Sequence, residues 1–307
     1  MQLIRSLVGI RVLAAVDDSG SFTAAAATLG ITQSAVSQHV AALERLVGQP
    51  LVEPRSRPVQ LTMAGRVLAE HGRAAVARLE AAERELDELA RRRVARIRLG
   101  SFPTALATFV PRAVRRLRAR QPEVSIWLVD DHMQGLWPRL HRREIDVALI
   151  FTDPPQPAVE GFVVTPLFVD RYAILLPRGH RLSDPSRPLR LRDLAEDTWV
   201  GGGPGSTWFR LVSGACRVEG FEPRVGLVSD DHVAVQAFVQ AGLGVAVVPG
   251  LAAVRRVPGV EVRSIVGPRP AREIAAAYPA GPFVPAGVLA MVEALQAVTR
   301  RVAATPP

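Results

Sequence analysis

Two short helical patterns separated by a glycine, near the N-terminus, constrain this chain most strongly. In the second pattern, residues 31–46, the apolar residues Val36, Val40 and Leu43 recur at three- and four-residue steps and therefore share one helical face. The opposite face opens with short, uncharged, hydrogen-bonding side chains: Gln33, Ser34, Ser37 and Gln38. Amides and hydroxyls at the N-terminal end of such a helix suit the reading of base edges in a major groove; an ordinary amphipathic surface helix is the alternative.

The residues before this helix favour the interpretation that it reads base edges. An apolar run over residues 7–16 predicts a helix, and a short alanine-rich helix over residues 22–29 follows it. Ser21 and Thr32 are expected to cap the second and third helices, because their hydroxyls can accept hydrogen bonds from amides of the first turn. Gly30 provides the tight turn between the last two helices, which together form a helix-turn-helix pattern.

A long, ordered set of residues extends this pattern: Gly20-Ser21-Phe22-Thr23, Ala25-Ala26, Thr32 to Gln38, Leu43-Glu44, Gly48, Leu51, Arg57, Leu61-Thr62 and Ala64-Gly65. In these residues the chain resembles the LysR-type transcriptional regulators. Residues 53–62 are read as a short two-stranded wing. The family usually has phenylalanine and then arginine in the wing where this chain has Val52 and Pro54, so the basic contact is expected from Arg55 or Arg57.

The resemblance implies a winged helix-turn-helix DNA-binding domain over residues 1–61. Its expected DNA-binding residues are Ser21, Thr32, Gln33, Ser34, Ser37, Gln38, Arg55 and Arg57. The residues of the third helix would read base edges, Thr32 would position a phosphate, and one of the two arginines would enter an adjacent groove.

Residues 62–93 predict one long linker helix. Its apolar residues step by sevens and by alternating threes and fours, as in a coiled-coil seam: Leu68, Ala75, Leu79, Ala82, Leu86 and Leu89. A rod of about 48 Å, at ~1.5 Å per residue, cannot bury this seam on the small winged domain alone. A dimer helix is therefore expected, with packing on the following domain as the alternative. Dimerisation would set two reading helices against the half-sites of an inverted repeat.

Strands alternate with helices over residues 94–307, which favours an α/β fold with a mostly parallel sheet and helices on both faces. The resemblance implies a type II periplasmic-binding-protein-like effector domain made of two subdomains. Subdomain I is expected over about residues 94–165 and 267–307, and subdomain II over about 166–266.

In such a domain the ligand groups lie at the carboxyl ends of strands and the amino ends of helices, where unpaired amides favour anions. The expected hydrogen-bonding and apolar cleft residues are Ser101, Phe102, Thr104, Phe151, Thr152, Gly203, Ser206 and Thr207, with Trp208 as a further wall. The alternative for each is an ordinary helix cap or core aromatic.

Two matching segments follow strands in the two subdomains, Asp130-Asp131-His132 and Asp230-Asp231-His232. Aspartate is a favoured helix N-cap, so two capped helices are one interpretation. The other is that Asp131 and Asp230 face each other across the cleft and select a cationic effector or a metal. Because no tight ligand spacing accompanies them, no metal or cofactor is predicted.

The composition limits which functions are possible but does not assign one. All 38 basic residues are arginine and the formal net charge is +9, which permits nucleic-acid binding without specifying it. The single cysteine, Cys216, excludes an internal disulfide and fits a reducing cytoplasm. No apolar run approaches the ~20 residues that a membrane span needs, and no signal segment is recognised. A cytoplasmic protein without a membrane partner is expected.

These features together predict a dimeric or tetrameric regulator that binds double-stranded DNA at an inverted-repeat promoter site and a small-molecule effector. RNA polymerase is kept open as a further partner. An enzyme and a solute-binding protein without DNA contact remain the alternatives. No catalytic residue is predicted, because the sequence contains no phosphate loop, nucleophile elbow or plausible Ser/His/Asp set.

Overall fold

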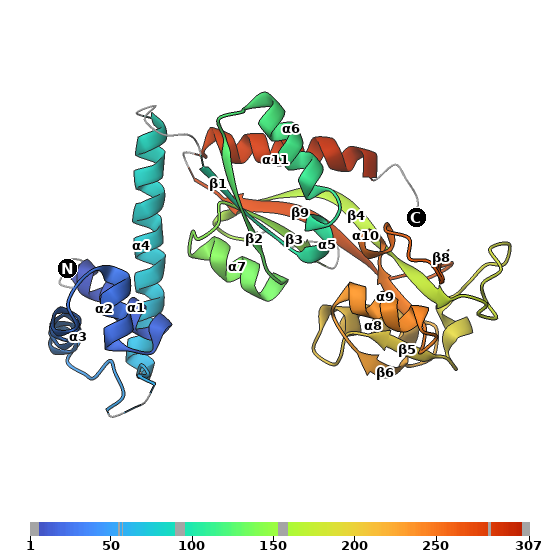
Figure 1. Ribbon diagram of the computed structural model, residues 1–307, viewed down its shortest axis with the longest axis horizontal. Coiled ribbons are helices and arrows are strands. Elements are labelled where there is room, and N and C mark those ends of the chain that lie inside the picture. The colour runs from blue at the N-terminus through green and yellow to red at the C-terminus, as the bar shows by residue number, and fades with distance from the viewer. Residues whose placement is uncertain are drawn as a thin grey trace. The chain divides into compact units, whose positions relative to one another are not determined.

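A computed structural model describes residues 6–54, 56, 58–89, 96–152, 159–281 and 284–302 (Figure 1). The chain divides into two compact units. The first comprises residues 1–94 and 138–145, and the second comprises residues 95–137 and 146–307. Each unit has its own hydrophobic core.

Four helices make up most of the first unit: α1 (Leu7–Ser19), α2 (Phe22–Leu29), α3 (Gln33–Val47) and α4 (Met63–Leu89). Glycines in the left-handed conformation end the first three helices, as at Gly30 with φ 66°, a conformation that costs glycine little. Small residues let the helices approach closely. A Cβ atom added at Gly72 of α4 would lie 2.1 Å from Ile10 Cγ2 on α1.

The described residues show part of the predicted wing. Among the described residues, its ladder consists of an antiparallel bridge between Val52 and Leu61, with the Glu53 amide donating to the Gln60 carbonyl at 2.8 Å. The amide of Thr62 donates to the Leu51 carbonyl at 3.0 Å. The expected two-stranded segment is therefore present as one bridge and its flanking bonds.

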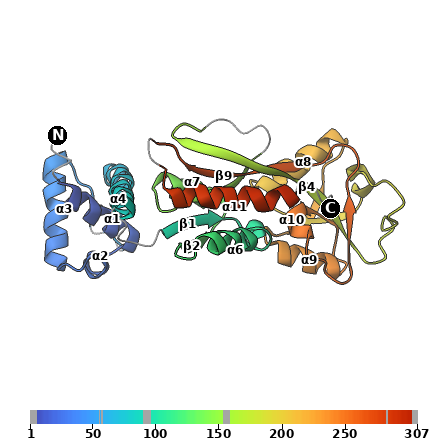
Figure 2. The same ribbon diagram turned by 90° about the horizontal axis from the view of Figure 1, so that it is seen from above.

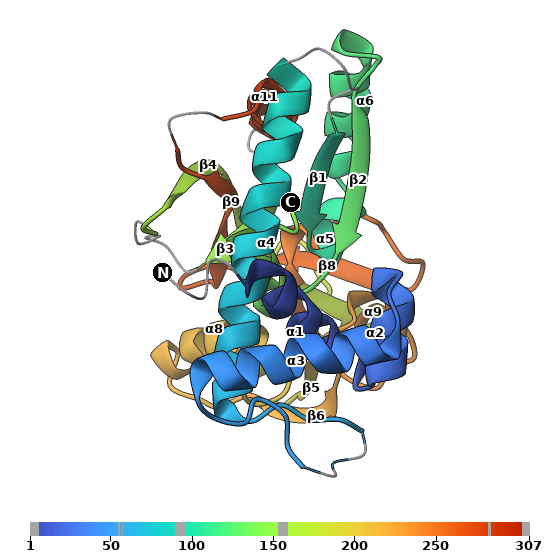
Figure 3. The same ribbon diagram turned by 90° about the vertical axis from the view of Figure 1, so that its left-hand side faces the viewer.

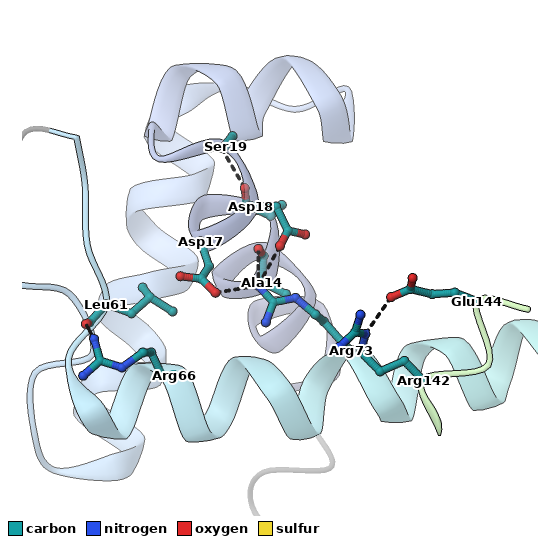
Figure 4. A network of polar contacts seen from close by, with 10 residues as sticks. Ala14, Asp17, Asp18, Ser19, Leu61, Arg66, Arg73, Arg142 and Glu144 are labelled. Carbon is teal, nitrogen blue, oxygen red and sulfur yellow. Dashed lines mark hydrogen bonds and ion pairs between the residues drawn. The ribbon is translucent and has the colours of Figure 1, made fainter. Parts of the chain in front are cut away.

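One arginine ties the linker helix to α1 (Figure 4). Nη2 of Arg73, on α4, lies 2.5 Å from Asp17 Oδ2 and 2.6 Å from Asp18 Oδ1. The two acids occupy the last turn of α1, where no basic residue compensates the helix dipole. The arginine supplies that positive charge from a neighbouring element.

The second unit contains a seven-stranded sheet in the order β2-β1-β3-β9-β4-β7, with β8 also paired to β4. The strands are β1 (Arg96–Ser101), β2 (Ser125–Asp130), β3 (Val147–Thr152), β4 (Phe162–Pro177), β7 (Ala246–Pro249), β8 (Val260–Ser264) and β9 (Ala271–Pro279). A separate two-stranded sheet pairs β5 (Thr198–Gly201) with β6 (Arg224–Val228).

Helices cover these sheets. They are α5 (Pro103–Leu106), α6 (Val110–Arg120), α7 (Met133–His141), α8 (Thr207–Val218), α9 (His232–Gln240), α10 (Gly250–Ala253) and α11 (Ala286–Val302), with a 3₁₀ turn η2 at Leu191–Leu194. Helices α6 and α11 lie side by side over the β1–β2 part of the sheet (Figure 2), and α7 lies on its other face (Figure 1).

We call β1–β3 with α5–α7 and α11 lobe I, and β5–β8 with η2 and α8–α10 lobe II. Strand β4 runs through both lobes, and β9 begins beside Arg171 of β4, where the chain returns to lobe I. The first part of β4 pairs with β9 up to Arg171, and the part from Tyr172 pairs with β7 and β8. Because these two strands are the long connection between the lobes, they are the natural position for a hinge.

The predicted mostly parallel sheet needs correction, since the sheet is mixed. Strand β1 is parallel to β2 and β3, whereas β4 and β9 run antiparallel to each other and to their other partners. Residues 162–177 form the single long strand β4. Among the described residues, no helix is long and apolar enough to cross a membrane.

Candidate nucleic-acid interface and ligand site

The N-terminal end of α3 combines a buried stripe with a polar surface. Val36, Val40 and Leu43 are 0, 4 and 1% exposed and pack on α1 and α2. The polar residues expected to contact bases are all exposed: Gln33, Ser34, Ser37 and Gln38. Figure 3 shows α3 crossing α1 at the surface of the first unit. Within the described residues of that unit, no other element covers these side chains, so they are available to a partner.

The two predicted caps are in place. Thr32 Oγ1 accepts from the Ala35 amide at 3.2 Å and lies 2.9 Å from Ser34 Oγ. Ser21 Oγ accepts from the Ala24 amide at 3.4 Å. Both hydroxyls therefore serve their own helices; direct phosphate contacts from them stay predictions. Arg55 and Arg57 lie outside the described residues.

Sequence reasoning missed the link between α3 and the wing. The carboxylate of Glu44, in the last turn of α3, accepts from the amides of Leu51 at 2.9 Å and Val52 at 3.4 Å. This fixes where the chain leaves α3 and enters the wing. The signal available in the sequence was an acid next to a buried leucine, which by itself has many other uses.

The linker helix exposes most of its predicted seam within one chain. Ala75, Leu79, Ala82 and Leu86 are exposed, with Leu79 and Leu86 at 51 and 64%. Leu68 instead packs against the winged core. A leucine seam left in water by its own protomer is a surface suited to a second helix.

In the second unit, two of the predicted ligand loops meet. The rings of Phe102, after β1, and Phe151, in β3, pack edge to face with centroids 5.0 Å apart. Phe102 is 3% exposed and belongs to the lobe I core. Ser101 is fully buried and its hydroxyl donates to the Phe102 carbonyl at 3.3 Å. These two residues thus support the loop from beneath.

A buried ion pair that the sequence did not reveal lies beside these rings. Arg272 on β9 and Asp170 on β4 face each other in the strand register. Arg272 Nε and Nη2 each lie 2.9 Å from Asp170 Oδ2, and both side chains are 4% exposed. Burial raises the pKa of Asp170, and this rise is opposed by the charge of Arg272 and by the amides of Leu251 and Gly250.

Arg272 also reaches both predicted loops of lobe I. Its guanidinium carbon lies 5.1 Å from the Phe102 ring centroid and 4.5 Å from that of Phe151, a geometry that favours cation–π attraction. Its Nη2 donates to Thr104 Oγ1 at 2.9 Å. Thr104, a predicted ligand residue, is therefore held by the hinge strand β9.

Lobe II contributes His232 at the start of α9. Its Nδ1 is buried and has no hydrogen-bond partner among the described residues. Burial, and secondarily the charge of Arg272, lower the pKa of His232 to about 4. The imidazole is therefore neutral at pH 7. The sequence singled out this histidine only as part of a repeated segment.

The glycine-rich loop brings two other predicted residues together. A Cβ atom at Gly202 would lie 2.4 Å from Asp230 Oδ1 and 2.5 Å from Ser206 Oγ, so only glycine leaves room there for both groups. Ser206 caps α8, accepting from the Phe209 amide at 3.0 Å. Thr207 and Gly203 are half-buried beside it.

Two expectations for side chains near the cleft need comment. Trp208 lies in the lobe II core at 7% exposure, and its indole donates to the Val247 carbonyl at 2.6 Å; it is a core residue rather than a wall. Thr152 Oγ1 is buried and has no partner among the described residues. Thr152 follows Phe151 in β3, and successive strand residues point to opposite faces.

In each repeated acidic segment an aspartate accepts a hydrogen bond from a nearby backbone amide, and in the second segment this caps a helix. Asp231 Oδ1 accepts from the Val233 amide at 2.8 Å and caps α9. Asp131 Oδ1 accepts from the His132 amide at 2.8 Å. No group of three or more metal-ligating side chains occurs in the part of the chain that the structure describes. The cap interpretation therefore accounts for the contact in the second segment.

A hollow of about 400 Å³ lies elsewhere, on the surface of lobe I between α6 and β2. Apolar side chains and two arginines line it: Leu106, Val110, Pro111, Val114, Arg115, Arg118 and Leu128. The unpartnered polar atoms His232 Nδ1 and Thr152 Oγ1 do not line it. Arg272 and the predicted cleft residues do not line this hollow either.

Comparison with known proteins agrees with both halves of this description. Residues 7–66 match the family described as "Bacterial regulatory helix-turn-helix protein, lysR family", and residues 90–300 match the "LysR substrate binding domain". A relative from Mycobacterium leprae (strain TN), named "Probable hydrogen peroxide-inducible genes activator", is 31% identical over 294 residues, covering 89% of this chain and 88% of its own length.

Solved structures share the fold. A full-length OxyR variant from Pseudomonas aeruginosa superposes with a TM-score of 0.71 at 21% identity, covering 94% of each chain. Full-length CbnR in complex with its target DNA superposes with a TM-score of 0.69 at 23% identity, covering 95% of this chain and 99% of CbnR. With both domain families matched in their expected order, this chain belongs to the LysR family and is a LysR-type transcriptional regulator.

Proposed function

We propose that this regulator binds an inverted-repeat promoter site as a homodimer or homotetramer and changes that binding when a small molecule enters the α/β unit. The exposed polar end of α3 carries the proposal. It places amides and hydroxyls on a helix whose other side is fully buried, the arrangement that direct readout in a major groove requires. Residues 1–61, 62–93 and 94–307 would then read DNA, pair the protomers and bind the effector.

A nuclease-protection footprint tests the DNA part. The full chain is placed on the DNA adjacent to its own gene, at two salt concentrations, with and without candidate metabolites. We expect a protected region that contains two related half-sites. It should be protected at both salt concentrations, at a protein concentration that does not protect random DNA. Gln33→Ala should require a higher protein concentration for this protection, whereas Gln134→Ala, at an exposed glutamine of α7 in the other unit, should leave it unchanged.

The exposed seam of α4 supports the oligomer. Leu79→Glu together with Leu86→Glu places two charges on the seam, and light scattering should then show a smaller assembly than the wild type. Arg78→Glu, at an exposed position next to the seam, is the matched control and should keep the original mass. An unchanged mass for the double variant would show that the seam does not pair.

We propose that the effector binds near the junction of the lobes, and the contacts of Arg272 with Thr104, Phe102 and Phe151 support this. A ligand there can act only through its different affinity for the two arrangements of the lobes. We infer no enzymatic activity, because the family members matched are regulators. Turnover of a bound metabolite would favour the enzyme alternative. Access to promoter DNA places the protein in the cytoplasm.

The M. leprae relative is named for hydrogen peroxide-inducible genes. We infer that this chain does not sense peroxide by oxidation of a thiol. Cys216 is the single cysteine, it is fully buried, and burial raises the pKa of its thiol to about 12. The thiolate is the reactive form of cysteine, and an intramolecular disulfide needs a second one. We therefore propose that the signal is a bound small molecule rather than the oxidation of a thiol.

A further inference from the structure

The hollow between α6 and β2 of lobe I has the size and the lining of a small-molecule site. Its volume is about 400 Å³, and ligand sites in proteins span about 300–1,000 Å³. Five of its seven lining residues are apolar and the other two are arginines. One of the apolar residues, Leu128 on the edge strand β2, is 46% exposed. A ligand with an apolar part would remove this surface from water, which favours binding.

The lining residues of α6 change from apolar to charged along the helix. Val110, Val114 and Arg118 follow one another at steps of four residues and share one row on the helix surface, and Pro111 and Arg115 lie in a neighbouring row. The helix rises about 12 Å between Val110 and Arg118, at ~1.5 Å per residue. The hollow therefore has an apolar end at the start of α6 and a cationic end near its last turn.

The two arginines at the cationic end can pair with a ligand. Arg115 and Arg118 are exposed, and neither makes a hydrogen bond or an ion pair with another residue that the structure describes. Helix α6 itself contains no acidic residue. A guanidinium presents its N–H donors in a planar fork that matches the two oxygens of a carboxylate. This end of the hollow therefore favours an anionic group.

We propose that the hollow binds an amphiphilic carboxylate of medium chain length, of the fatty-acid class. Its alkyl chain lies along Leu106, Val110 and Val114, and its carboxylate accepts hydrogen bonds from Arg115 and Arg118. A cation of the same length meets the charge of the two arginines, and a small polar anion leaves the apolar lining in water. The inference goes beyond the proposed function, because it requires neither DNA binding nor a ligand at the junction of the lobes.

Calorimetry on the full-length protein tests the chemistry of the ligand, with each probe below the concentration at which it forms micelles. Decanoate should bind at least about threefold more tightly than octanoate, because each methylene group that leaves water strengthens binding by up to about fourfold. It should also bind at least about threefold more tightly than 1-decanol, which has no charge to pair with the arginines. Decyltrimethylammonium should bind more weakly than 1-decanol. No binding of decanoate, or affinities that do not depend on chain length and charge, would overturn the proposal.

Two variants of equal charge locate the site on α6. Arg115→Gln/Arg118→Gln should weaken decanoate binding by at least about threefold and leave 1-decanol binding unchanged, because only the pairing with the carboxylate is lost. Arg112→Gln/Arg116→Gln removes the same charge from exposed arginines of α6 that do not line the hollow, and should bind decanoate like the wild type. Equal weakening by the two variants would indicate attraction to the whole helix and would overturn the site.

Two further measurements separate a free ligand from other occupants of the hollow. Light scattering should give the same mass with and without decanoate. A smaller assembly in decanoate would show that a second copy of the chain covers the hollow, and would overturn the proposal. The protein should not sediment with phosphatidylglycerol vesicles. Sedimentation that is lost in Arg115→Gln/Arg118→Gln would assign the hollow to an anionic membrane surface instead of a free carboxylate.

Discussion

The buried pair between Asp170 and Arg272 should contribute strongly to the stability of the α/β unit, and a double-mutant cycle measures how much. Arg272→Gln leaves the Asp170 carboxylate 4% exposed with only backbone amides as partners. Removing one member of a buried ion pair costs about 3–5 kcal/mol. For a unit of roughly 200 residues, with a urea m-value near 2.5 kcal/mol/M, the transition midpoint should fall by about 1–2 M.

The double variant Asp170→Asn/Arg272→Gln should recover most of that loss. It leaves no buried charge and allows an amide–amide hydrogen bond between neighbouring strands, so its cost should be about 1–2 kcal/mol. The coupling energy of the cycle should therefore be about 2 kcal/mol or more. Arg224→Gln is the control, because it breaks an exposed pair with Glu196 at 2.9 Å and should cost less than about 1 kcal/mol.

Tryptophan fluorescence makes the measurement selective. All four tryptophans, Trp127, Trp137, Trp199 and Trp208, belong to the second unit, so their emission reports its unfolding without the first unit. A coupling energy near zero, or a single variant as stable as the control, would refute the claim that this pair holds the junction of the lobes.

Three further changes have defined outcomes. The pKa of His232 is lowered to about 4 from an ordinary 6.5, so the unfolded state binds a proton more readily than the folded state. The free energy of unfolding should therefore be highest above pH 6.5 and fall by about 2 kcal/mol by pH 5. In urea titrations His232→Leu should remove that part of the loss, and an unchanged pH dependence in this variant would contradict the argument. Gly72→Ala should lower the stability of the first unit by about 1–2 kcal/mol, because the added methyl group overpacks Ile10. Gly214→Ala has open space around it and should raise the stability of the second unit by up to about 1 kcal/mol. Circular dichroism on heating measures both changes. Hydrogen peroxide should leave DNA affinity unchanged in the wild type and in Cys216→Ala; a peroxide response that requires Cys216 would contradict the burial argument.

Local patterns predicted much of this fold, because their causes are local. Ser206, for which a helix cap was one interpretation, caps the helix over 207–218. The stripe of Val36, Val40 and Leu43 is buried as its spacing requires. The exposure of Leu79 and Leu86 on the linker helix follows from the same kind of periodicity.

The parts that sequence reasoning missed depend on contacts between distant segments. Asp170 and Arg272 are 102 positions apart, and nothing in either neighbourhood specifies the other. Asp170 and Arg171 interrupt the apolar run of one continuous strand, so the local pattern there does not show that the strand continues. Trp208 was predicted to be a cleft wall because it follows the glycine-rich loop, but its indole donates to the Val247 carbonyl within the lobe II core. Each of these features depends on strand register and on packing between distant segments, which local sequence patterns do not specify.

The central claim is that the polar end of α3 reads base edges. It is tested most directly by the ratio of dissociation constants for the promoter site and for random duplex DNA, measured by fluorescence anisotropy at one salt concentration. Gln33→Ala and Ser37→Ala should each weaken promoter binding by about 5- to 150-fold, the equivalent of about 1–3 kcal/mol per lost base contact, and change random-DNA binding less than twofold. Equal weakening on both DNAs, or none on either, would contradict direct readout by this helix.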